Sequence, residues 1–446
     1  MVAPLDLETL VAVIDLFINI VMHTGYEYGS LLTGRGTVIS RYQFRDGKMI
    51  VGWPARNKAF PDQLFVGVSA TPCQSSAVAD IKDIVLWEES APRISSSPYI
   101  GGEDAANTFE RFKQYIRLAK ELKANMLGMT LSWSLIIPGG LGGTINEETI
   151  DEYSDLITEM MENDITPIVT LFHDDTPDPL KYLGGWTNPL IVDWFEAYAR
   201  IAYAAFGEKV KYWVTIDDPV SYCLRNYDGE SAETAGISGS AVYLCGHHLL
   251  LAHVRVYNVY QQHFRWKQKG HVGVIQNFRW FEPESANSFD DIMGARVAHE
   301  WYNAWLMNPL FHNVTDYPAN MKGRIEFKSR YRNFPKSRLP TFTAEQMHEM
   351  KGAADFLGID FHAAKRVRGL EIDAGENPGF NRDADISIIS NVDQGEPADI
   401  ENWSRNFRKF LYKLNIDLNL PDLFIIRNKK NYFLEYSGGV AYDIQD

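Results

Sequence analysis

Thr166 to His173 has the sequence TPIVTLFH, a mostly apolar run rich in β-branched and aromatic residues, with no alternation of polar and apolar positions. Such a run is typical of a strand that is buried on both faces, as in a parallel sheet covered by helices. A stretch with helical spacing lies on either side of it, Glu147 to Asn163 before and Pro189 to Phe206 after. The region therefore predicts one strand of a β/α sheet, flanked by two helices.

The same alternation of strand and helix extends over most of the chain. The further predicted strands are Leu64 to Thr71, Met126 to Trp133, Lys211 to Ile216, Val272 to Asn277, Phe356 to Phe361 and Leu423 to Ile426. The further predicted helices are Asn107 to Lys123, Ser238 to Lys269, Asp290 to Leu306 and Ile400 to Leu414. These strands are one short of a closed eight-stranded barrel, and Val21 to Leu32, after a helical pattern over Leu5 to Ile20, is the candidate for the missing one.

We therefore expect an α/β protein with the (β/α)8 TIM-barrel architecture, in a single domain over residues 1–446, because no linker-like tract divides the chain. The net charge of −15 disfavours binding to nucleic acid or to anionic lipid. Thr9 to Met22 is the most apolar early stretch, but it contains Asp15 and is too short to span a membrane. Gly34-Arg35-Gly36 is too short to be a phosphate loop, and no cofactor is predicted.

Cysteines and glycosylation motifs bear on the compartment. Cys73, Cys223 and Cys245 are an odd number and lie far apart, so we expect no disulfide framework. Asn313-Val314-Thr315 and Asn402-Trp403-Ser404 match the acceptor motif for N-glycosylation, which favours an extracellular or secretory location. Such triplets also arise by chance, so the compartment stays open.

Asn107 to Pro219 resembles glycoside hydrolase family 1, the group of β-glucosidases and myrosinases, almost without gaps. The phrases that carry the resemblance include FPDQLFVGVSATPCQ (60–74), LSWSLIIPGG (131–140), TPIVTLFHDDTPDPL (166–180), GGWTNPLIVDWF (184–195), FGEKVKYWVTIDDP (206–219), WFEP (280–283), NPLFHNVTDYP (308–318) and DFLGIDF (355–361). They occur in the family's order over most of the chain. The resemblance implies the same barrel, with a site at the carboxyl ends of its strands.

The order of the remaining motifs departs from the family's. In the family, the strand with the nucleophile is followed by a helix, a last strand with the phrase GYFxWSLLDNFEW, and an RFG segment. Here the counterpart of the nucleophile strand, LFIIRNK (423–429), lies near the end, whereas a helix, GYEYGSLL (25–32) and RYQF (41–44) stand near the beginning. We interpret this order as a circular permutation, although a chain cut from a tandem array of such domains would show it too. Residues 1–59 then correspond to the family's C-terminal helix, last strand and tail, and residues 60–446 to its strands one to seven.

The resemblance places the catalytic positions at two altered residues. Retaining hydrolysis uses two carboxyl groups about 5–5.5 Å apart, one as acid/base and the other as nucleophile. At the acid/base position the family's glutamate has become Asp218, whose shorter side chain withdraws the proton donor from the reacting oxygen. At the nucleophile position the glutamate has become Arg427, and a protonated guanidinium cannot attack an anomeric carbon. We expect Arg427 to face Asp217 and Asp218 in an ion pair, because an unpaired buried guanidinium is costly.

By the same resemblance, the residues that support the nucleophile and hold the sugar are changed as well. Two of these residues neighbour the nucleophile: Gly128 replaces an arginine beside it, and His362 replaces a tyrosine that hydrogen-bonds it. Gly36 and Thr37 replace a glutamate and a tryptophan that hold the sugar. Gly29 and Asp174 replace two further tryptophans. Gln74 and His173 remain from the sugar subsite.

Simpler roles compete with these assignments. Asp217, Asp218 and Arg427 fit a structural salt bridge left from the ancestral site, or a site altered for an anionic ligand. A hard metal ion would suit the acidic group of His173, Asp174, Asp175 and Asp178, but no loop spacing supports one, and no metal is predicted. Packing is the simpler role for His247, His248, Trp133, Trp186 and Trp213, and a structural role for Asp175.

We therefore predict a catalytically inactive β-glucosidase-like protein, a pseudoenzyme, that binds an unknown small molecule or protein partner at the altered mouth of the barrel. Candidate ligand-binding residues are Gln74, His173, Asp174, Asp217, Asp218, His362, Arg427, Gly29, Gly36 and Thr37. A protein partner is suggested by the resemblance to the Klotho co-receptors, family members that also lack catalytic carboxylates. The alternatives are a β-glycosidase with residual or altered activity that uses Asp218, and a structural or storage protein.

Overall fold

The structure is a computed structural model, and it describes residues 42–45, 48–51, 67–70, 102–121, 126–140, 144–228, 239–372, 378–391 and 422–428, with a few helical residues between 406 and 414. The chain divides into two compact units. One unit comprises residues 1–65 and 400–417, and the other comprises residues 66–399 and 418–446. Within the first unit, β1 (Tyr42–Arg45) and β2 (Lys48–Val51) form an antiparallel hairpin with Tyr42 opposite Val51.

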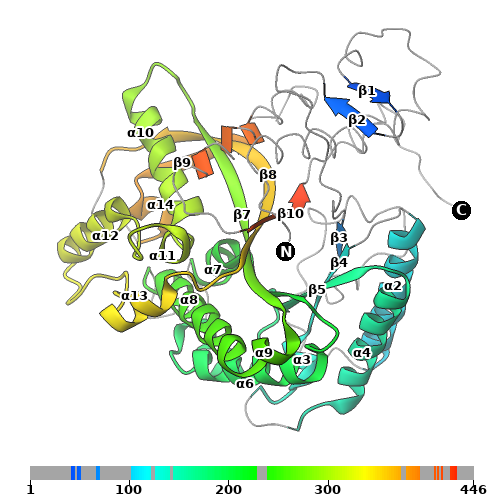
Figure 1. Ribbon diagram of the computed structural model, residues 1–446. Coiled ribbons are helices and arrows are strands. Elements are labelled where there is room, and N and C mark those ends of the chain that lie inside the picture. The colour runs from blue at the N-terminus through cyan, green and yellow to red at the C-terminus, as the bar shows by residue number, and fades with distance from the viewer. Residues whose placement is uncertain are drawn as a thin grey trace, which may run out of the picture. The chain divides into compact units, whose positions relative to one another are not determined.

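The second unit is built on a parallel sheet whose strand order follows the chain. The strands are β3 (Gly67–Ala70), β4 (Met126–Thr130), β5 (Thr166–Phe172), β6 (Tyr212–Asp217), β7 (His271–Pro283), β8 (Phe356–Gly369) and β10 (Asp422–Asn428). A further strand, β9 (Ile386–Asn391), pairs antiparallel with the far end of β8. The two end strands of the path, β3 and β10, approach each other, so the sheet curves back on itself (Figure 1).

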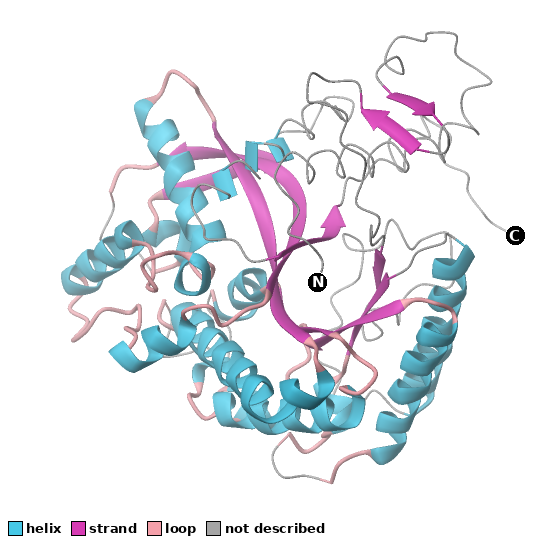
Figure 2. Ribbon diagram, viewed as in Figure 1, coloured by secondary structure: helices cyan, strands magenta, loops and turns pink. Residues whose placement is uncertain are grey.

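Helices cover the outer face of this curved sheet (Figure 2). The longer ones are α2 (Gly102–Glu121), α4 (Glu147–Glu162), α6 (Ile191–Phe206), α8 (Ala241–Val259), α10 (Phe289–Ala298) and α12 (Ala319–Tyr331). The shorter ones are α3 (Trp133–Ile136), α5 (Asp178–Tyr182), α7 (Pro219–Tyr227), α9 (Arg265–Gln268), α11 (Asn308–Phe311), α13 (Ala344–Met350) and α14 (Phe380–Asp383). A 3₁₀ turn, η4 (Gly185–Thr187), and two π-helical segments, η5 (Tyr260–Phe264) and η6 (His299–Ala304), complete the described helical elements.

Local sequence explains where these elements begin and what they bury. The side chain of Asn146 accepts a hydrogen bond from the backbone of Thr149 and so caps α4, while α6 turns Phe195 and Tyr198 toward the sheet. The indole of Trp133 stacks on the ring of Tyr198, with ring centroids 5.2 Å apart. Large aromatic side chains thus fill the layer between strands and helices, and Trp133, Trp186 and Trp213 are fully buried there as predicted.

The predicted strands and helices that fall on described residues are largely confirmed, but several bounds differ. β7 and β8 extend past the predicted ends at Asn277 and Phe361 to Pro283 and Gly369, and β9 was not predicted. The helix expected over Asp290 to Leu306 is interrupted by η6. The strand expected over Met126 to Trp133 ends at Thr130, because the hydroxyl of Ser132 accepts a hydrogen bond from Leu135 N and begins α3. The helix expected over Ser238 to Lys269 is interrupted by η5.

Two expectations concern other parts of the chain. The candidate eighth strand, Val21 to Leu32, lies outside the described residues. None of the described helices is long and apolar enough to cross a bilayer.

Candidate functional site

The carboxyl ends of β5 and β6 bring two polar side chains together. His173 directly follows β5, and Asp217 is the last residue of β6. Both are buried, with 8% of the surface of His173 and 1% of that of Asp217 exposed. His173 Nδ1 lies 3.6 Å from Asp217 Oδ2, which is longer than a hydrogen bond. These two predicted site residues are therefore neighbours at the rim where barrel active sites lie.

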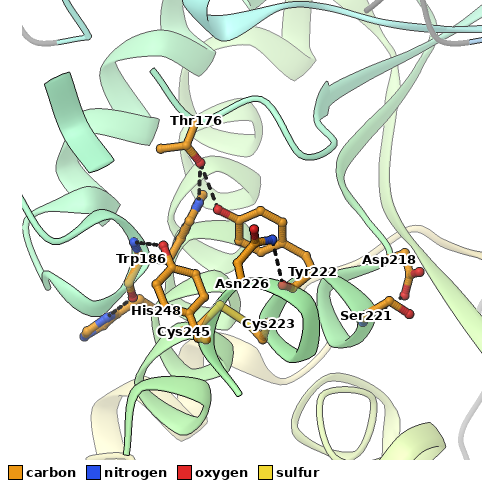
Figure 3. Close-up of a disulfide and its surroundings, with 10 residues drawn as sticks. Thr176, Trp186, Asp218, Ser221, Tyr222, Cys223, Asn226, Cys245 and His248 are labelled. Atoms are coloured by element: carbon orange, nitrogen blue, oxygen red, sulfur yellow. Dashed lines mark hydrogen bonds between the residues drawn. A yellow bond between two sulfur atoms is a disulfide. The ribbon is translucent and has the colours of Figure 1, made fainter. Parts of the chain in front are cut away.

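Asp218, which the sequence resemblance predicts to be at the acid/base position, caps a helix. Its φ of 49° is left-handed, a conformation that aspartate tolerates better than most residues. Its Oδ1 accepts a hydrogen bond from Ser221 N at 3.2 Å, and Pro219 occupies the first position of α7 (Figure 3). One carboxylate oxygen of Asp218 is thus engaged with the backbone of α7, where the positive end of the helix dipole favours a negative charge.

The other acidic side chains near His173 have separate partners. Asp174 forms an ion pair with Arg225 of α7, in a partly exposed position. Asp175 accepts hydrogen bonds of 2.5 Å from the hydroxyls of Ser132 and Ser134, which supports the structural role predicted for it. Asp178 pairs with Lys181 at 2.8 Å within α5. Over the described residues, no group of three or more His, Cys, Asp or Glu side chains is arranged to hold a metal ion.

The backbone register shows which residues lie beside residue 427, the predicted nucleophile position. Asn277 of β7 lies opposite Asp360 of β8, and Asp360 lies opposite Arg427 of β10, where the register shifts by one residue between Ile425 and Arg427. Asp360 is 1% exposed. Residue 427 is therefore placed beside a buried carboxylate-bearing position on the neighbouring strand.

Several predicted site residues stay untested. The side chains of Arg427 and His362 are not among those described, so the expected ion pair of Arg427 with Asp217 and Asp218 stays a prediction. Gln74, Gly29, Gly36, Thr37 and Asn402 lie outside the described residues altogether.

Two polar atoms near this rim lack hydrogen-bond partners. His173 Nδ1 and Asn277 Oδ1 are both shielded from solvent, and neither has a hydrogen-bond partner within the described part of the chain. An unsatisfied buried polar group costs about 1–3 kcal/mol, so such atoms call for a ligand or bound water.

A cation lies beside α7 that was not predicted from the sequence. Arg279 of β7 donates a hydrogen bond from Nη2 to Ser221 Oγ at 3.1 Å, and its guanidinium lies over the ring of Tyr302, 5.2 Å from the centroid. A positive charge therefore stands near the turn that Asp218 caps. Arg279 directly precedes the Trp280 to Pro283 motif of the resemblance, and that position is the only signal the sequence offered.

We expected no disulfide framework, but the described residues contain one disulfide bond, which was not predicted. Cys223 of α7 and Cys245 of α8 are joined, with Cα atoms 5.8 Å apart and both side chains buried (Figure 3). The two cysteines are 22 residues apart in sequence, but each lies on the face where its helix packs against the other. The bond ties the helix that Asp218 caps to the outer layer of the barrel.

Hydrogen bonds to Thr176 and Trp186 also hold α7 in place. Trp186 donates from Nε1 to Thr176 Oγ1 at 3.0 Å, and Thr176 Oγ1 lies 3.1 Å from the hydroxyl of Tyr222 (Figure 3). The backbone N–H of Trp186 donates to the hydroxyl of Tyr227 at 3.1 Å. Burial raises the pKa of Tyr222 well above its ordinary value, so this hydroxyl stays protonated. α7 is therefore fixed on several sides.

The adjacent histidines of α8 have the packing role that was predicted. His247 stacks on Phe342, with ring centroids 4.7 Å apart, and its Nδ1 lies 3.0 Å from the hydroxyl of Tyr317. His248 Nδ1 lies 2.8 Å from the carbonyl oxygen of Trp186. Burial lowers the pKa of His247 to about 4, which keeps it neutral near pH 7.

A parallel sheet with helices outside, and polar side chains at the carboxyl ends of its strands, defines an α/β-barrel protein with a site at its rim.

The family model for glycosyl hydrolase family 1 matches residues 56–440. Myrosinase 1 of Brevicoryne brassicae is 30% identical over 381 residues, which cover 83% of this chain and 80% of that protein. Cytosolic beta-glucosidase of Cavia porcellus is 31% identical over 377 residues, with coverage of 83% and 80%.

Solved structures agree with this assignment. The aphid myrosinase matches with a TM-score of 0.68 at 28% identity, covering 82% of this chain and 80% of its own. A rice β-glucosidase, Os3BGlu6, matches with a TM-score of 0.67 at 26% identity, with coverage of 83% and 80%. The chain belongs to glycosyl hydrolase family 1, and its relatives imply the (β/α)8 barrel.

The disulfide gives the first prediction. Replacing Cys223 and Cys245 together with alanine should lower the free energy of unfolding by about 3 kcal/mol, because the unfolded chain gains the freedom that a crosslink across 22 residues removes. Urea denaturation monitored by tryptophan fluorescence measures the change. Asn287→Ala, at an exposed position, serves as the control and should behave as wild type. Equal stability of wild type and the double variant would show that the bond does not stabilise the fold.

Proposed function

We propose that this chain no longer hydrolyses β-glycosides by the retaining mechanism and instead binds a polar small molecule at the rim of the barrel. The proposal rests chiefly on the identity of residue 427. The resemblance assigns the attacking carboxylate to this position in β10, and the chain has an arginine there. A guanidinium has no lone pair available for attack, and its positive charge opposes the oxocarbenium-like transition state.

The acid/base position supports the same proposal independently. An acid/base catalyst must deliver a proton to the leaving oxygen and later activate water. Asp218 is one methylene shorter than the glutamate it replaces, and its Oδ1 accepts the hydrogen bond of Ser221 N. Aspartate is among the preferred helix caps, so this residue has a sufficient structural reason to be present.

The unsatisfied polar atoms support binding. His173 Nδ1, directly after β5, and Asn277 Oδ1, in the middle of β7, are buried atoms that could still accept or donate a hydrogen bond. A molecule rich in hydroxyl or amide groups would satisfy both atoms, which makes such a ligand favourable at this rim. No comparable observation favours a protein partner or a storage role.

The assay for this function uses an aryl β-glucoside. Wild type and Asp218→Asn should both release the phenol at the rate of the buffer blank, because neither retains a nucleophile. Asp218→Glu/Arg427→Glu, which restores both carboxyl groups, should exceed wild type. Wild-type turnover that Asp218→Asn abolishes would contradict the proposal and establish an altered hydrolase. Mass spectrometry of an extract of the purified protein should also show a polar molecule that is absent from His173→Phe.

We further propose that residues 1–59 supply the missing strand of the barrel, as in a circular permutation. The family model begins its match at residue 56, so nearly all of this segment lies outside the match. Two observations support the proposal: the described strands β3 to β8 and β10 form the path of a barrel that is eight-stranded in the family, and the sequence over 25–44 resembles the family's last strand and tail.

Deletion of residues 1–41 tests this assignment. Without an eighth strand the sheet edges of β3 and β10 would be left unpaired, so the truncated chain should lose cooperative thermal unfolding. Calorimetry measures the transition, and deletion of residues 1–4 is the control that should leave it unchanged. A truncated chain that melts like the full one would show that another segment, or none, closes the barrel.

A further inference from the structure

The loop between α11 and α12 is an exposed bend anchored by core residues. Phe311 before it and Tyr317 near its end are both buried. Between them, the N–H of Asp316 donates to the carbonyl oxygen of Val314 at 2.8 Å, and Val314 N donates to His312 Nδ1 at 3.0 Å. The backbone of this loop is therefore held in one tight turn by its own hydrogen bonds.

The tip of this bend carries the sequon Asn313-Val314-Thr315. Asn313 is exposed, and 63% of the surface of Val314 is exposed beside it. Acceptor asparagines of N-glycosylated proteins lie in surface loops of this kind. A sugar on Asn313 would cover part of Val314 and remove apolar surface from water, which is favourable.

The disulfide between Cys223 and Cys245 is an independent sign of the same compartment. Disulfides form and persist in oxidising environments such as the secretory pathway and are rare in the cytosol. The secretory pathway is also where asparagine side chains are glycosylated. A sequon alone is weak evidence for glycosylation. An exposed sequon together with a buried disulfide points to folding in the secretory pathway.

We propose that Asn313 carries an N-linked glycan, attached as the chain passes through an oxidising secretory compartment. In this reaction Nδ2 of Asn313 forms a bond to the anomeric carbon of an oligosaccharide carried on a lipid diphosphate. The bond from that carbon to the diphosphate oxygen breaks, the lipid diphosphate leaves, and the amide nitrogen loses one proton to a base. This site is separate from the rim and does not depend on the function proposed there.

The native protein, digested after treatment with peptide N-glycosidase in ¹⁸O-labelled water, tests this site. The peptide that contains Asn313 should carry an ¹⁸O-labelled aspartate there, which marks an asparagine that held a glycan. Asn313→Gln and Thr315→Ala, expressed in cells of the source, should each migrate faster by one glycan. Asn287→Gln, an exposed asparagine outside any sequon, should migrate as wild type. Asn313 recovered only as unlabelled asparagine would overturn the proposal.

Thiol labelling of the denatured, unreduced protein tests whether the disulfide between Cys223 and Cys245 is formed. One of the three cysteines should react before reduction and all three after it. Three reactive thiols before reduction would mean that the chain folds in a reducing compartment, and this would overturn the proposal as well.

Discussion

The parallel arrangement of the strands is the constraint on which the rest of this structure depends. Because neighbouring strands run in the same direction and follow chain order, their carboxyl ends meet at one rim. His173 directly follows β5 and Asp217 ends β6, so these two side chains lie together at that rim. The same register fixes the backbone of residue 427 opposite Asp360. The charge of residue 427 therefore bears on a rim that several strands share.

The turn from β6 into α7 gives Asp218 a structural role. Asp218 adopts a left-handed conformation and caps α7 through Ser221, while Arg279 contacts the same first turn. Further along, α7 is joined to α8 by the disulfide. The turn is thus held by a cap, a cation and a covalent bond, none of which requires glycosidase chemistry. These contacts give Asp218 a structural role in the turn.

Strand positions were predictable because runs such as Thr166 to Phe172 are buried on both faces and contain no polar alternation. The end of β4 was placed too late, since the cap at Ser132 is recognised only when Leu135 N is seen to donate to it. The disulfide was missed because cysteine spacing does not report the contact between α7 and α8. Arg279 was missed for a similar reason, since the irregular register between Phe278 and Trp280 is not visible in the sequence. The residues at the rim were predicted from the resemblance to the family. The residues that contact them could be identified only from the folded structure.

Trapping of a covalent intermediate tests most directly the proposed loss of the attacking group. A 2-deoxy-2-fluoro-β-glucoside with a good leaving group glycosylates the nucleophile of retaining enzymes and then hydrolyses slowly, so the adduct accumulates. Intact mass spectrometry of this chain after prolonged incubation with such a reagent should show the unmodified mass alone. A stoichiometric gain of one fluorosugar, mapped by digestion to a carboxylate at the rim, would contradict the account.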